Sequence, residues 1–228
     1  MRRSFGLLTA GFAVIGLAAS AAPLSFAAAP AQDWRASVRE LAVSHFKNPA
    51  WGYSHCLRDY ALAKELAAAD HAAVDDDVLF AASFLHDMAA FPPWEDTKTD
   101  HSDVGARVVD TVLKGTGFPM EKIDAVRGAI RTHMYYRDPV GTEALYLHDA
   151  DALDWLGAIG VARVTALVDP HGGNPDSKKA VEMLTDNLSK VPSRVLSPAG
   201  RARVPERQAE LQKYLSDLKR ESEDLKTL

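Results

Sequence analysis

The chain of 228 residues contains a single cysteine, Cys56. One cysteine excludes an internal disulfide and any zinc site built from several thiolates. The sequence also lacks a stripe of lysine and arginine, and its formal net charge is −5, which argues against nucleic-acid binding. Alternating apolar and polar runs, typical of strands, are hard to find. These absences leave a globular protein whose core and chemistry depend on other residue types.

The N-terminal segment differs from the rest of the chain. Residues 1–29 begin with Arg2-Arg3, continue with an apolar stretch from Phe5 to Ala22 and end in small residues, which is the order of an export signal. The apolar stretch is too short and too diluted by glycine for a comfortable membrane span. Its start resembles a twin-arginine signal in part. We therefore expect an export signal peptide, a periplasmic mature protein and no membrane span after signal removal.

Apolar residues recur at helical spacing through the remainder of the chain. The predicted helices cover residues 33–46, 55–69, 75–86, 102–114, 120–133, 143–156 and 158–168, and an amphipathic helix with Leu211, Leu215, Leu218 and Leu225 closes the chain. Prolines and glycines separate these segments. The sequence therefore predicts an all-α fold in which residues 30–228 form one domain of about eight or nine helices.

Four of the eight histidines stand where their helices should show an apolar residue: His55, His86, His101 and His133. Asp87 follows His86 directly. A buried polar group without a partner costs on the order of 1–3 kcal/mol, so several of them scattered through one small core would be strongly destabilising. A shared cation would satisfy them all, and ligands from several facing helices converge readily in a helical bundle. A single inward histidine would predict a hydrogen-bonded core residue, whereas this set predicts a metal site.

Residues 145–163 supply further acids, and their pattern leaves the choice among them open. Asp151 and Asp154 share a helical face, whereas Asp149 lies about 200° away from Asp151 and cannot point into the same site. The simplest arrangement has one inward acid and two solvated or capping acids. His148 lies within a turn of Asp151, and periodicity favours Asp151 only weakly.

The order of His55, the doublet His86-Asp87 and Asp151 resembles the HD superfamily, a group of all-α, metal-dependent phosphohydrolases named for the adjacent His and Asp. "HCLRDYALAKEL" is similar to the first-histidine helix of that family, and "FLHDMAAF" matches the doublet. "DADALDWLGAIGVARV" is similar to the last-ligand segment of a branch of small bacterial HD hydrolases. The resemblance covers most of the mature chain, from about His55 to Arg163.

The resemblance implies a mononuclear metal centre, whose ligands would be His55, His86, Asp87 and Asp151. Two positions depart from the pattern of the family. Ala152 stands where that branch usually has arginine, and Trp51-Gly52 stands where close relatives often carry another His-Asp pair. Both departures could bear on phosphate recognition, so the metal is better defined than the substrate class.

Two further histidines, His101 and His133, match those that some family members use for a second metal and others use to contact the substrate phosphate. Imidazole and carboxylate ligands without thiolate suit Mn, Fe, Zn, Co or Ni, and also Mg, as one divalent cation or two. The expected reaction is hydrolysis of a phosphate ester or anhydride, including a nucleotide, by a metal-activated water. Asp87 would orient or deprotonate this water, and His101 or His133 would steady the phosphate or protonate the leaving group. Arg58 and Arg163 are candidate contacts to an anionic, small-molecule substrate.

Two alternatives stay open at this point. Cyanamide hydratases are HD proteins that hydrate a small nitrile, and "SHCLRDY" is also similar to their first-histidine segment. His101 and the "DADALD" segment look more like the phosphohydrolase branch. The second alternative is an exported, non-catalytic domain whose metal site is structural or binds an effector. The oligomeric state is not indicated by the sequence.

Overall fold

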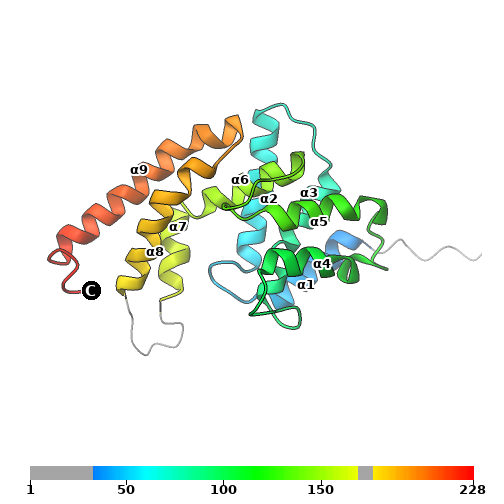
Figure 1. Cartoon of the computed structure of the whole chain (residues 1–228), viewed down its shortest axis with the longest axis horizontal. Helices are drawn as coiled ribbons and strands as arrows, with labels where there is room; N and C mark the ends of the chain where they lie inside the picture. The colour runs from blue at the N-terminus through cyan, green and yellow to red at the C-terminus, as the bar shows by residue number, and fades with distance from the viewer. Residues whose placement is uncertain (1–32, 169–176) are drawn as a thin grey trace, which may run out of the picture. The chain divides into compact units, whose positions relative to one another are not determined.

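The computed structural model describes residues 33–168 and 177–228, so the expectation for residues 1–29 lies outside the described residues. Within the described ranges the chain forms nine α-helices and three short 3-10 helices, and no strand (Figure 1). This confirms the predicted all-α fold. Among the described helices, none combines the length and apolar character that crossing a membrane requires.

The helices follow one another closely along the chain. The α-helices are α1 (Trp34–His45), α2 (Tyr53–Ala69), α3 (Asp76–Leu85), α4 (His101–Leu113), α5 (Ile123–Thr132), α6 (Thr142–Asp154), α7 (Gly157–Ala166), α8 (Ser177–Lys190) and α9 (Pro198–Glu221). The 3-10 helices are η1 (Met88–Ala90), η2 (Met120–Lys122) and η3 (Pro192–Arg194).

The C-terminal part differs from the predicted helices in two ways. Helix α8 was not predicted, because its sequence is mostly polar and buries only Ala180 and Leu184. Helix α9 ends at Glu221, so Leu225, which was predicted to belong to the C-terminal helix, lies beyond its end. Leu225 and the two residues before it have positive φ angles, which an α-helix cannot accommodate.

Acidic residues cap the N-termini of α3, which His86 follows, and of α4, which begins with His101. The Asp75 carboxylate accepts hydrogen bonds from the backbone N–H groups of Asp77 and Val78 at the start of α3. The Asp100 carboxylate accepts one from Ser102 at the start of α4. Each cap satisfies N–H groups that lack a partner within the helix and contributes about 1 kcal/mol. The caps therefore help to fix where each helix starts.

Helix α3 lies at the centre of the core. All residues from Val78 to Leu85 are buried, and α1, α2, α5 and α6 pack around them. The rings of Phe80 and Phe84 stack with centroids 4.4 Å apart, and Trp34 meets Phe80 edge-on. A helix surrounded on all sides has little freedom to shift. It therefore holds the doublet at its C-terminal end in a fixed position.

Helix α6 joins two groups of helices. On one side it packs against α2, α3 and α5, and on another it contacts α7 and α9. Helices α7, α8 and α9 also pack against one another, and Figure 1 shows them beside the group formed by α1 to α5. Side chains on α6 can therefore be buried on more than one face.

Candidate metal centre

His55 and His86 meet in the core from different helices. His55 lies in the first turn of α2, His86 follows the last residue of α3, and both side chains are fully buried. Their Nε2 atoms are 3.2 Å apart. Nδ1 of His86 lies 2.9 Å from the carbonyl oxygen of Ser83, and Nδ1 of His55 lies 2.8 Å from Oδ2 of Asp154. Both rings are thus held through Nδ1 and present Nε2 to one point, as metal-binding histidines do.

Three buried carboxylates surround these two Nε2 atoms. Nε2 of His55 lies 3.1 Å from Oδ2 of Asp59, 3.3 Å from Oδ1 of Asp151 and 3.6 Å from Oδ2 of Asp87. One ligand atom from each of His55, Asp59, His86 and Asp151 falls within 4.8 Å of all the others. Imidazole nitrogens and carboxylate oxygens at such separations form a donor set for a divalent cation.

Asp87 links this group to a second group of donors. Its Oδ2 lies 3.3 Å from Nε2 of His86, and its Oδ1 lies 3.1 Å from Nε2 of His101 and 3.6 Å from Nε2 of His133. Ligand atoms of His86, Asp87 and His133 also lie within 4.8 Å of one another. The structure therefore brings together all six residues that the sequence placed in the pocket, and Asp87 stands between the two halves.

Burial and neighbouring charges set the protonation of the second group. Burial lowers the pKa of His133. Burial also opposes protonation of His101, but the carboxylate of Asp87 outweighs it and raises the pKa of His101. Burial would raise the pKa of Asp87, yet His86, His101 and His133 together hold that pKa well below its usual range. Asp87 is therefore an ionised carboxylate at the centre of the site.

Several buried polar atoms of the centre have no hydrogen-bond partner among the described residues. They are Oδ1 and Oδ2 of Asp59 and the Nε2 atoms of His101 and His133. Leaving such an atom unpaired costs on the order of 1–3 kcal/mol. All of them belong to the donor groups described above, where a cation would satisfy them. The residues therefore fit a divalent metal ion.

Asp154 supports His55 from behind. Its carboxylate accepts hydrogen bonds from Nη2 of Arg58 at 2.7 Å and Nη1 of Arg163 at 3.1 Å. Burial opposes ionisation of Asp154, but His55 and the two arginines lower its pKa well below the usual range. Arg163 is only 2% exposed and also donates to the carbonyl oxygen of Ala50. The two arginines predicted as substrate contacts are thus held by Asp154, and neither lines the pocket described below.

Two residues of the centre, Asp59 and Asp154, were not predicted from the sequence. A signal existed for each of them. Asp59 follows His55 by four residues and Asp154 follows Asp151 by three, so each shares a helical face with an expected ligand. Asp59 lies in the ring of donors itself, and Asp154 orients one of its histidines.

The expectation of one inward acid on α6 is wrong. Asp149, Asp151 and Asp154 are all buried, and so is His148. The reason is that the segment before α9 covers the face of α6 opposite the metal centre. There Asp149 accepts hydrogen bonds from the backbone N–H groups that begin the next helix, at Leu196 and Ser197.

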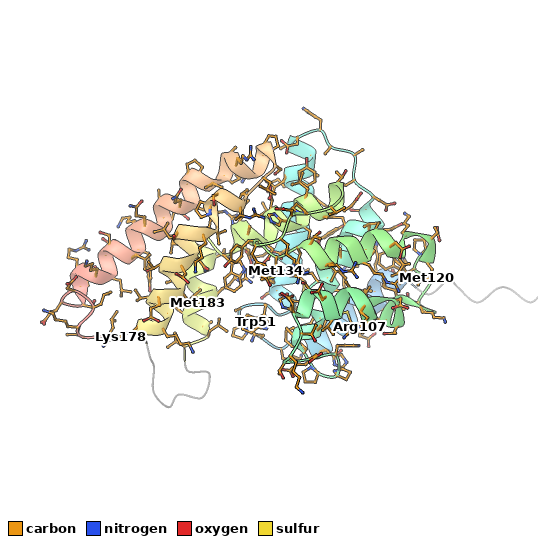
Figure 2. The ribbon with its side chains drawn as sticks, in the orientation of Figure 1. Trp51, Arg107, Met120, Met134, Lys178 and Met183 are labelled. Carbon is orange, nitrogen blue, oxygen red and sulfur yellow. The ribbon has the colours of Figure 1, made fainter. Side chains whose placement is uncertain are left out.

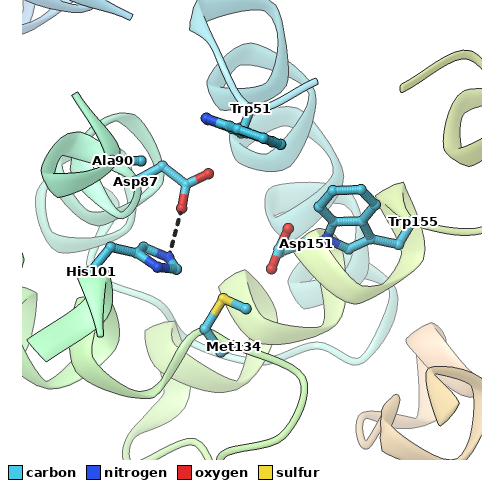
Figure 3. A pocket seen from close by; sticks show the side chains of 7 residues that line it. All are labelled: Trp51, Asp87, Ala90, His101, Met134, Asp151 and Trp155. Carbon is cyan, nitrogen blue, oxygen red and sulfur yellow. Dashed lines mark ion pairs between the residues drawn. The ribbon is translucent and has the colours of Figure 1, made fainter. Parts of the chain in front are cut away.

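A pocket of about 230 Å³ opens onto the centre. Its lining residues are Trp51, Asp87, Ala90, His101, Met134, Asp151 and Trp155 (Figure 3). Asp87 and His101 lie on one side, and Asp151 faces them from the other. In Figure 2, Trp51 and Met134 lie between helices α7 and α4. Trp51, which stands where close relatives often carry a His-Asp pair, therefore helps to form the pocket.

Fold and site together define a class: an all-α protein with a buried cluster of histidines and aspartates that can hold a metal. The family model for the HD domain matches residues 52–156, which contain both donor groups. Residues 52–156 therefore form an HD domain, as the motifs indicated.

Solved structures share the fold. The chain is similar to a predicted HD superfamily hydrolase from an uncultured Thermotogales bacterium, with 25% identity over 83% of this chain and 91% of that one, and a TM-score of 0.58. It is also similar to Bacillus subtilis YpgQ in complex with ADP, with 22% identity, 82% and 97% coverage, and a TM-score of 0.62. An HD-superfamily hydrolase from Bacillus thuringiensis shows 20% identity, 74% and 85% coverage, and a TM-score of 0.55. No curated protein matches the chain. The fold is thus that of HD superfamily hydrolases.

Proposed function

We propose that the protein is a metal-dependent phosphohydrolase that cleaves a phosphate ester or anhydride. One observation carries this proposal: two acids of the buried donor groups, Asp87 and Asp151, form part of the wall of an open pocket. A substrate in the pocket would therefore lie directly against the bound cation. Such a cation lowers the pKa of a bound water and polarises a phosphoryl oxygen.

The protein's own groups in the pocket suit proton transfer. Oδ1 of Asp87 lies 3.1 Å from Nε2 of His101, and this ion pair raises the pKa of His101 (Figure 3). The ring stands at the pocket wall, where its protonated form can donate a proton to a leaving oxygen. Asp87 is ionised and can orient or accept a proton from an attacking water. His133 is fully buried, and its Nε2 lies 3.6 Å from the same Oδ1 of Asp87.

The choice of compounds to test is based on a similar solved structure and on the N-terminal segment. YpgQ was crystallised with ADP, so nucleoside diphosphates belong in the panel. Residues 1–29 have the order of an export signal, and we propose a periplasmic enzyme that acts on a small phosphorylated compound there.

The test is a hydrolysis assay on protein stripped of metal and reloaded with Mn, Mg, Fe, Co, Ni or Zn. The panel contains p-nitrophenyl phosphate and nucleoside mono-, di- and triphosphates. We expect phosphate release with at least one metal and none from the stripped protein. An Asp87→Asn variant should lose the activity, whereas Asp70→Asn, which changes an acid outside the centre, should keep it. Metal-loaded protein that hydrolyses no phosphate compound would overturn the proposal.

Hydration of a small nitrile is a second candidate, because of the character of the pocket wall. Among the described residues that line it, none is lysine or arginine, and Trp51, Ala90, Met134 and Trp155 are apolar. Such a wall suits a small uncharged substrate better than a highly charged one. Cyanamide belongs in the same assay, and formation of urea without phosphatase activity would select this function.

A further inference from the structure

Asp59 is a buried acid whose surroundings differ from those of an ordinary core carboxylate. Its side chain is 0% exposed, and neither carboxylate oxygen has a hydrogen-bond partner among the described residues. Arg58, its neighbour in the chain, donates to Asp154 instead. A buried carboxylate without donors is strongly unfavourable unless a cation compensates it. Among the described residues, Asp59 therefore has ion-pair contacts with the imidazoles of His55 and His86 but no hydrogen-bond donor, and a cation would be the partner that compensates its charge.

The position of Asp59 points to the metal as that partner. Asp59 follows His55 by four residues on α2, which places both side chains on one helical face. Its Oδ2 lies 3.1 Å from Nε2 of His55 and 3.6 Å from Nε2 of His86. Two adjacent donors that each bind one cation at about 2.1 Å are separated by about 3.0–3.5 Å. The observed distances are close to those of neighbouring ligands on a single ion.

We infer that Asp59 is a direct ligand of the metal, in addition to the four ligands that the HD motifs indicate. The four-donor group supports this, since it contains Asp59 together with His55, His86 and Asp151. Asp87 falls instead in the second group, with His86 and His133, and its Oδ2 still lies 3.3 Å from Nε2 of His86. The centre thus offers one cation two imidazoles and three carboxylates. The inference rests on the metal centre of the proposed function and deepens it.

A donor set of this size affects which metal is bound. Zinc is usually satisfied by four ligands, whereas manganese and magnesium prefer six and favour oxygen. Five protein donors leave one position free on a six-coordinate ion. Asp59 therefore stabilises bound Mn²⁺ more than bound Zn²⁺.

The test compares metal affinities of three purified proteins: the wild type, Asp59→Asn and Asp70→Asn. Asp70 follows the last residue of the same helix and accepts hydrogen bonds from Ala199 and Tyr146, so it provides the same change outside the centre. Free Mn²⁺ is measured by electron paramagnetic resonance, and Zn²⁺ by competition with a chromophoric chelator.

We expect Asp59→Asn to weaken Mn²⁺ binding about tenfold or more, and Zn²⁺ binding less. Asp70→Asn should bind both metals as the wild type does. An Asp59→Asn protein that keeps wild-type Mn²⁺ affinity would overturn the inference, and equal loss of both metals would overturn the preference for Mn²⁺.

A measurement on the wild type decides the matter even where the variant does not fold. In a crystal structure of the Mn²⁺-loaded protein, an oxygen of Asp59 should lie about 2.0–2.2 Å from the metal. An Asp59 side chain outside the coordination shell would overturn the inference. Neither experiment measures turnover. A protein that binds Mn²⁺ through Asp59 but hydrolyses no phosphate would retain the ligand and lose the proposed function.

Discussion

Two faces of helix α6 bury acids, and the partners of those acids differ. Toward the start of α9, Asp149 accepts backbone hydrogen bonds from Leu196 at 2.9 Å and Ser197 at 2.6 Å, and Nδ1 of His148 lies 3.0 Å from the same carboxylate. Toward α2, Asp151 has no backbone N–H partner among the described residues, and its Oδ1 lies 3.3 Å from Nε2 of His55.

The difference separates a structural acid from a ligand. Both faces carry a buried histidine close to a buried aspartate, so burial and residue type alone do not distinguish them. Backbone N–H groups satisfy the first carboxylate within the protein, and that carboxylate ties a loop to α6. The second carboxylate faces imidazole nitrogens and open pocket, which leaves its charge available to a cation.

The largest expected effect comes from exchanging a histidine on each face for alanine. His86→Ala should remove both bound metal and turnover, because it deletes a ligand that belongs to both donor groups. His148→Ala should retain metal, because His148 contacts Asp149 and none of the donors. Elemental analysis and the hydrolysis assay measure the two outcomes. Full metal content in His86→Ala, with activity, would contradict the assignment of the metal face.

The next effect concerns proton transfer at the pocket. His101 is 28% exposed by its side chain and pairs with Asp87. His101→Ala should lower kcat by about 10²–10⁴ if the ring acts as a general acid, while the tight group around His55 still binds one metal. Single-turnover kinetics on metal-loaded protein would measure this loss. A variant with wild-type kcat would show that His101 has no part in the chemical step.

The third prediction concerns Asp149, the structural acid of α6, and the free energy of unfolding. Asp149→Ala leaves two backbone N–H groups without an acceptor, a partly buried one at Leu196 and a buried one at Ser197. Removing these charged hydrogen bonds should lower the free energy of unfolding by about 3 kcal/mol. Urea denaturation gives this value, and elemental analysis of the folded protein should show unchanged metal content. Loss of metal at unchanged stability would place Asp149 in the metal centre instead.

Helix patterns and one doublet carried much of what the sequence could predict. Apolar spacing predicted the all-α fold and most of the helices, and the six residues expected in the site do lie close together. Helix α8 was not predicted from apolar spacing, because it buries few residues. The burial of His148 and Asp149 could not be predicted, because it depends on the loop before α9, which follows more than forty residues later in the sequence. Periodicity describes one helix at a time and does not show which neighbour covers a second face.

Asp154 gives the smallest expected effect and the sharpest test of the comparison, because it shares features with both faces. Like Asp149 it accepts hydrogen bonds from protein donors, here Arg58 and Arg163. Unlike Asp149 it also holds Nδ1 of His55, at 2.8 Å. Asp154→Asn should weaken metal binding by about 10–100-fold, because a supporting partner orients the ligand and increases its basicity. Asp149→Asn is the matched control and should leave the metal affinity unchanged. Equal metal affinities in the two variants would mean that the buried acids of α6 are alike, and that contact with a ligand histidine does not set Asp154 apart.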